Sequence, residues 1–244
     1  MKRHDGRDAA ELRPISIQPD FLDTPLGSAL ITWGNTRVLC TASVEERLPP
    51  WMAASKRGWV TAEYAMHPAS TDPRKRREGG KGSVSGRSQE IQRLVGRSLR
   101  QAVNMKALGP RQIVVDCDVL QADGGTRTAS ITGGWVALSI ALNRLIESGA
   151  VGPQVFGPQI AAVSVGIVGD QVLCDLDYPE DSKAQTDANF VLAPPAGLIE
   201  VQATAENGAF SDQQLGEMVQ MATTACQQIA ALQREVVAAV SAGA

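Results

Sequence analysis

The sequence predicts a mixed fold of β-hairpins and helices, laid out twice along the chain. Two turns, at Gly34 and Gly169, each separate two runs rich in β-branched and apolar residues, which is the pattern of a β-hairpin. Each half then ends in a long stretch with helical character, 128–147 in the first and 212–240 in the second. Both turns lead into Val-Leu-Cys, which hints at an internal duplication.

The first half of the chain alternates short expected strands with turn residues. Its expected strands are 27–33, 37–44, 59–64 and 112–120. The stretch 68–88 is polar, basic and rich in glycine, so we expect an exposed, mobile loop. A helix is expected over 89–103, because one stripe of its surface is apolar while arginines lie roughly opposite; the stripe consists of Ile91, Leu94, Val95, Leu99 and Ala102.

The second half follows a linker-like stretch, 149–158, that is rich in glycine and proline. A hairpin is expected from 159–168 and 171–176, and further strands near 189–192 and 198–204. Ser211 and Gln214 have the spacing of a capping box, which predicts where the last helix begins.

Composition indicates a globular, cytoplasmic protein. The 244 residues are 43% hydrophobic and 20% charged, and no apolar run approaches the roughly 20 residues that span a bilayer. The charged N-terminus lacks the apolar stretch of a signal peptide. Four scattered cysteines are expected to be buried free thiols, and two histidines make a serine-hydrolase triad or a histidine-rich metal site improbable.

Charge is distributed unevenly. The net charge is −3, yet residues 73–111 hold eleven Lys or Arg against two acidic residues, a local charge of +9. Such asymmetry fits a polyanion bound on one face, with a merely solvated helix and loop as the alternative. Aromatic residues make up only 4%, so phosphate contacts rather than base stacking would dominate the binding of a nucleic acid.

The most informative stretch is Asp123-Gly-Gly-Thr-Arg127, between an expected strand and an expected helix. A glycine turn there leaves backbone N–H groups at the positive end of the helix dipole, and an arginine adds a two-pronged donor for phosphate. The alternative is a tight turn with a solvated arginine. A second anion contact is possible at Arg87, but neither a Walker loop nor a GxGxxG motif is present, which disfavours ATP and NAD.

Four carboxylates lie close together after a strand of the second half: Asp177, Glu180, Asp181 and Asp187. Such a group suits Mg²⁺, and one carboxyl can exchange protons with a leaving oxygen; an ordinary acidic loop is the alternative. With the anion turn and the basic segment, the residues indicate phosphoryl transfer on a polynucleotide.

The chain resembles the ribonuclease PH family of phosphate-dependent 3′ exoribonucleases, which trim precursor tRNA. The matching motifs, in order along nearly the whole chain, are Gly6-Arg7, Glu11-Leu-Arg-Pro14, Gly34-Asn-Thr36, Gly58-Trp-Val-Thr-Ala-Glu-Tyr64, Gly86 to Arg100, Asp116 to Ile131, Glu180-Asp-Ser182 and Val201 to Glu206.

The resemblance implies a duplicated α+β fold in one compact domain, 1–244, with halves at about 1–148 and 158–240. It also implies a homohexameric ring, a trimer of dimers. The activity would be phosphorolysis of precursor tRNA and other 3′-extended RNA, with inorganic phosphate as co-substrate and Mg²⁺ as cofactor. Nucleoside diphosphates would be released, and the reverse reaction would add nucleotides.

The resemblance also implies roles for individual residues. Phosphate would be bound by Arg87, Gly125, Thr126 and Arg127. Asp181 and Asp187 would be the acidic pair for Mg²⁺ and proton transfer. RNA, or a neighbouring subunit, would face Arg74, Arg76, Arg77, Arg93, Arg97 and Arg100.

The chain departs from the family pattern at 65–70, where the usual Met-Leu-Pro-Arg segment is missing, and at Ala203, where the family has glycine. These departures concern RNA contacts rather than chemistry. The main alternative function is a non-catalytic RNA-binding ring subunit of the exosome type. A small-molecule kinase is a further alternative, but it lacks a nucleotide loop and leaves the basic segment unexplained.

Overall fold

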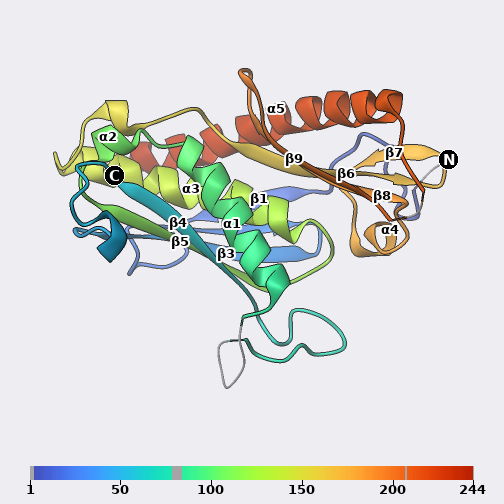
Figure 1. Ribbon diagram of the computed structural model, residues 1–244, viewed down its shortest axis with the longest axis horizontal. Coiled ribbons are helices and arrows are strands. Elements are labelled where there is room, and N and C mark those ends of the chain that lie inside the picture. Colours follow the sequence, from blue (N-terminus) through green and yellow to red (C-terminus); the bar gives the residue numbers. More distant parts are fainter. Residues whose placement is uncertain (1–2, 79–83, 207, 244) are drawn as a thin grey trace.

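The computed structural model describes residues 3–78, 84–206 and 208–243, which form two β-sheets and their covering helices (Figure 1). The first sheet has the order β1-β2-β3-β5-β4, and only β4 and β5 run parallel. Its strands are β1 (Ile15–Pro19), β2 (Gly27–Trp33), β3 (Thr36–Glu45), β4 (Trp59–Met66) and β5 (Gln112–Gln121). All but β1 were expected from the sequence.

The second sheet is antiparallel, with the order β7-β6-β8-β9. Its strands are β6 (Ala161–Val168), β7 (Gln171–Cys174), β8 (Thr186–Ala193) and β9 (Gly197–Ala205). The hairpins at Gly34 and Gly169 both form, and both glycines have positive φ. β8 begins at Thr186, three residues before the expected start, and therefore includes Asp187.

Helix α3 (Thr126–Glu147) packs against strands of both sheets, and 17 of its 22 residues are buried. Contrary to the expectation that no apolar run approaches a membrane-spanning length, this helix is long and apolar enough to cross a membrane by length and composition. However, 83% of its apolar window is buried inside the protein, so α3 is a core helix. Its N-terminus follows β5 directly and positions the predicted anion turn.

Two other long helices cover the sheets. Helix α1 (Gly86–Gln101) buries the predicted apolar stripe against β4 and α3. Helix α5 (Asp212–Gly243) covers the second sheet and runs along most of the long axis (Figure 1). Its predicted capping box is confirmed, because Gln214 N donates to Ser211 Oγ at 3.2 Å and Ser211 N donates to Gln214 Oε1 at 2.8 Å.

Several short elements were not expected. They are helices α2 (Met105–Leu108) and α4 (Tyr178–Asp181) and single 3₁₀ turns at Pro50–Met52 and Pro153–Val155, the latter inside the linker-like stretch. The described part of the chain after β4 projects from the body of the molecule (Figure 1). Residues 79–83 of the expected mobile loop lie outside the described residues. All four cysteines are free and buried, as predicted.

Candidate phosphate and carboxylate site

The predicted glycine turn joins β5 to α3. Gly124 and Gly125 have φ of +74° and +67°, in the left-handed region that favours glycine. A Cβ on Gly124 would lie only 2.6 Å from the carbonyl oxygen of Leu176, so the turn packs backbone to backbone against the chain before α4. No side chain caps α3, and the N–H groups of its first turn therefore lack a partner within the helix or from a cap.

A cavity of about 610 Å³ opens at this end of α3. Residues from the turn, from α1, from α4 and from β8 all line it, although they are far apart in the sequence. It brings together seven residues of the predicted sites: Arg74, Arg87, Gly125, Thr126, Arg127, Asp181 and Asp187.

Arg127 lines this cavity and carries one unpaired donor. Its Nη2 donates to Glu90 Oε2 at 2.7 Å, and its Nη1 lies 4.0 Å from Asp187 Oδ2. Its Nε is buried without a hydrogen-bond partner among the described residues. Buried donors of this kind are rarely left unpaired, and together with the uncapped helix end this one fits a bound oxyanion such as phosphate.

The hydroxyl of Thr126 is hydrogen-bonded to that of a buried tyrosine, Tyr64. The hydroxyl groups of Tyr64 and Thr126 lie 2.9 Å apart, and Tyr64 is 2% exposed. Burial raises the pKa of Tyr64, so its hydroxyl stays protonated at neutral pH. When the Tyr64 hydroxyl donates this hydrogen bond, the hydroxyl hydrogen of Thr126 is free to point at an anion in the cavity.

Asp181 and Asp187 form the acidic side of the cavity. Asp181 is exposed at the end of α4, and Asp187 is half-buried on β8. Burial, and then the charge of Asp181, raises the pKa of Asp187 to about 6, against the opposing effect of Arg127 and Arg87. Partial removal of its carboxyl from water also raises the pKa of Asp181, against the opposing charges of Arg87 and Arg127. A carboxylate pair that resists ionisation in this way fits a divalent cation, which stabilises both anions.

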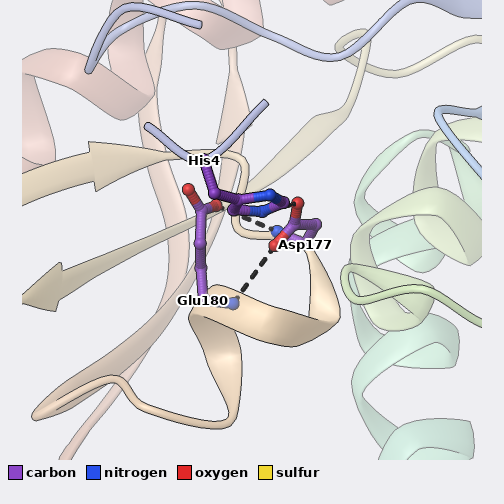
Figure 2. Close-up of side chains that lie close together, drawn as sticks. All are labelled: His4, Asp177 and Glu180. Carbon is purple, nitrogen blue, oxygen red and sulfur yellow. Dashed lines mark hydrogen bonds and ion pairs between the residues drawn. The ribbon is translucent and has the colours of Figure 1, made fainter. Parts of the chain in front are cut away.

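The other two carboxylates of the predicted cluster serve a different purpose. Figure 2 shows the side chains of Asp177 and Glu180 close to His4, and neither residue lines the cavity. Asp177 and Glu180 form a capping box at the start of α4, and Asp177 Oδ2 lies 2.7 Å from His4 Nε2.

These three residues have ligand atoms within 4.8 Å of one another, yet Glu180 already receives two donors from the buried guanidinium of Arg3. The expected four-carboxylate cluster is therefore two pairs, one in the cavity and one in an ion-pair network.

The six arginines predicted to bind RNA fall into three groups. Arg74, Arg76 and Arg77 are exposed on the segment after β4, and Arg74 lines the cavity. Arg93 is exposed on α1. Arg97 and Arg100 contact other side chains or backbone of the protein itself.

The two arginines near the end of α1 make intramolecular contacts. Arg97 pairs with Glu200 of β9. The guanidinium of Arg100 lies 4.5 Å above the ring of Trp59 and donates to the carbonyl of Val60 at 3.0 Å. The RNA-binding role of these two arginines stays a prediction, and the packing gives Arg100 a structural role as well.

Sequence reasoning missed other polar residues around the cavity. Tyr178, Ser164 and Asn189 line it, and Asn189 lies two residues after Asp187 on β8, so both side chains share one face of the strand. That period of two is the signal that could have identified Asn189. Arg13 lies behind the turn, and no local pattern indicates its partners.

Comparisons with known proteins identify the family of the chain. Residues 11–142 match the model for domain 1 of the 3′ exoribonuclease family, and residues 159–225 match domain 2. The chain is 52% identical to a Ribonuclease PH of Methylobacterium radiotolerans over 97% of its length and 100% of that protein. It is 54% identical to one of Neisseria meningitidis over 89% and 90%.

Solved structures share the fold at low identity. Rice Rrp46 superposes with a TM-score of 0.78 at 18% identity, covering 96% of this chain and 100% of that one. A chain of an Archaeoglobus fulgidus exosome with RNA bound to the active site gives 0.77 at 21% identity, covering 93% and 91%. Two family models and relatives at about half identity over most of the chain lead to one conclusion: the chain belongs to the ribonuclease PH family of 3′ exoribonucleases.

Proposed function

We propose that this protein is a phosphorolytic 3′–5′ exoribonuclease that trims precursor tRNA and other 3′-extended RNA. One observation carries the proposal: the orphaned Nε of Arg127, at the uncapped end of α3, and the carboxylate pair Asp181 and Asp187 belong to one cavity. A cationic phosphate cradle facing an acidic pair suits transfer of a phosphoryl group between two oxygens.

Inorganic phosphate is the attacking group. Arg87, Arg127, the Thr126 hydroxyl and the N–H groups that follow Gly125 hold it and withdraw charge from it. One of its oxygens attacks the phosphorus of the terminal 3′,5′-phosphodiester, and the bond to the 3′ oxygen of the preceding nucleotide breaks. The products are a nucleoside 5′-diphosphate and an RNA one nucleotide shorter. Nothing else is consumed, so the reverse reaction adds nucleotides from diphosphates.

The acidic pair handles the leaving oxygen. A carboxyl of Asp181 or Asp187 donates a proton to the departing 3′ oxygen, while the other carboxylate of the pair stays ionised. Mg²⁺ would be held by the same two side chains and, when bound, would neutralise charge on the phosphoryl oxygens.

The exposed arginines after β4 lead RNA toward this cavity. Arg74 lies at its edge, and Arg76 and Arg77 are exposed nearby in the chain. They would bind backbone phosphates, with little sequence readout. We further propose the homohexamer, a trimer of dimers, and a cytoplasmic location, with the whole chain acting as one domain in two halves.

The test is product identification. The protein is incubated with a 3′-extended RNA and Mg²⁺, with and without phosphate, and the mononucleotides are separated. Nucleoside diphosphates formed only with phosphate support the proposal. Monophosphates would mean hydrolysis, and absence of any product would favour the alternative, a non-catalytic RNA-binding ring subunit of the exosome type.

A further inference from the structure

We propose that Arg13 is a positioning residue that fixes the separation between the phosphate turn and α4, the helix that carries Asp181. The inference rests on the proposed function. Arg13 does not line the cavity and is 6% exposed, so it does not meet the substrates itself. It contacts both walls of the cavity from behind.

The first contact is with the chain that leads into α4. Arg13 donates to Asp175 from Nη2 at 2.6 Å to Oδ1, from Nε at 3.0 Å to Oδ2, and from its backbone N at 2.7 Å to Oδ2. This is a two-pronged pairing between a buried guanidinium and a carboxylate that is 1% exposed. Trp33 Nε1 donates to the same carboxylate at 2.9 Å.

Asp175 transmits this contact to the acidic site. It has φ of +54°, rare for a residue with a side chain, and it lies two residues before Asp177, the N-cap of α4. α4 is a single turn that ends at Asp181. A shift of Asp175 therefore moves the whole short helix and the carboxylate at its end.

The second contact is with the phosphate turn. Arg13 Nη1 donates to the carbonyl oxygen of Asp123 at 2.5 Å. Two residues later Gly125 is the N-cap of α3, and a Cβ there would lie 3.0 Å from Arg13 Nη2. One guanidinium thus spans from the turn to the carboxylate that orients α4.

Hydrogen bonds that do not involve Arg13 also hold the phosphate turn in place relative to α4. The Asp123 carboxylate accepts from Asn35 Nδ2 at 3.1 Å and from the N–H of Tyr178, the first residue of α4, at 3.4 Å. The positions of phosphate and proton donor are set to within fractions of an ångström in efficient phosphoryl transfer, and loss of such alignment slows chemistry more than binding.

The test is Arg13→Lys. Lysine keeps the positive charge, but its single side-chain nitrogen can hydrogen-bond only one of the two partners, Asp175 or the carbonyl of Asp123. We expect kcat for trimming at saturating RNA and phosphate to fall about tenfold or more. We expect the phosphate Kd, measured by calorimetry without RNA, to change by less than about threefold, because Arg87, Arg127 and the turn remain.

Arg144→Lys is the matched control. Arg144 also bridges a backbone carbonyl and an aspartate, with Nη1 donating to Leu26 O at 2.9 Å and Nη2 to Asp20 Oδ2 at 2.8 Å, but it lies outside the lining of the cavity. Its kcat should match the unmodified protein. Asp175→Asn keeps the size of the side chain but removes the charge that pairs with Arg13, and it carries the test if Arg13→Lys does not fold, with the same split expected between kcat and Kd.

The inference is overturned if Arg13→Lys folds and keeps kcat within twofold, or if its phosphate Kd weakens in parallel with kcat. For Asp175→Asn the same two results overturn it. Failure of the proposed function looks different, because the unmodified protein would then show no phosphate-dependent trimming at all.

Discussion

Arg127 donates from Nη2 to Glu90 Oε2 at 2.7 Å, which ties the phosphate turn at the start of α3 to the first turns of α1. This pairing fixes the plane of the guanidinium. It occupies one end of the fork and leaves Nε buried without a partner. Arg127 is therefore held ready for an anion at a small entropic cost, since its side chain is already ordered.

The first prediction follows from that geometry. Arg127→Ala removes a charge-assisted donor pair, each bond being worth about 1.5–3 kcal/mol, so the KM for phosphate should rise at least about tenfold. Steady-state trimming at varied phosphate measures this. The control is Arg47→Ala, an exposed arginine 87% accessible to solvent and outside the cavity lining. An unchanged phosphate dependence in Arg127→Ala would exclude this residue from the phosphate site.

Asp181→Asn tests the acidic pair. The amide cannot donate a carboxyl proton and is a weaker ligand for Mg²⁺, so Mg²⁺-dependent turnover should be lost. Because Asp181 is exposed on α4, the fold and the assembly state should be retained. Turnover is measured with and without Mg²⁺, and the mass by light scattering. Retained turnover would transfer the acid role to Asp187.

Asp187 predicts a pH-dependent stability. Its pKa of about 6 in the folded protein lies above the ordinary value of 3.8, so the native state holds a proton that the unfolded state has released between these pH values. Stability is therefore lost as the pH rises through about 6. Asp187→Asn should be more stable than the unmodified protein by about 3 kcal/mol at pH 8 and about equally stable below pH 4.

Urea unfolding in EDTA, without phosphate, checks this at pH 4 and pH 8. Asp170→Asn, at an exposed position in the β6–β7 turn, is the control and should show no such difference between the two pH values. A stability gain in Asp187→Asn that is the same at both pH values would contradict a buried, charge-strained carboxyl.

The arginines after β4 predict a salt dependence. If Arg76 and Arg77 bind RNA phosphates, replacing both by Gln should lower the slope of log K against log salt by about 1.4, at roughly 0.7 per phosphate on a single strand. Arg47→Gln is the contrasting variant, because Arg47 is an exposed arginine outside the predicted RNA-binding set and the cavity lining. It should leave the slope unchanged. A slope unaffected by the double substitution would place RNA elsewhere.

Much of the fold could be predicted from local pattern. The strand 112–120, the glycine turn and the helix from 128 were expected nearly where β5, Gly124 and α3 lie, because hydrophobic period and turn chemistry are encoded over a few residues. β1 and α4 were missed since elements of four or five residues carry too little period. The cavity residues were identified through the turn, the acidic segment and the family resemblance.

Burial of charge could not be predicted in the same way. No local pattern indicates that Arg3 and Arg13 are buried, because their carboxylate partners are Glu180 and Asp175, more than 160 residues away. A buried arginine is tolerated only once such partners are assembled, so its place depends on the tertiary fold. For the same reason, spacing in the sequence could not show that Asp177 belongs to the ion-pair network and Asp181 to the cavity.

The central claim is that the anion at Arg127 is the attacking phosphate. The most direct measurement supplies ³²P-labelled inorganic phosphate with a 3′-extended RNA and analyses the released nucleotides. The account predicts label in the β-phosphate of nucleoside diphosphates with the unmodified protein, and loss of that label in Arg127→Ala at the same phosphate concentration. Unlabelled nucleoside monophosphates from the unmodified protein would contradict it.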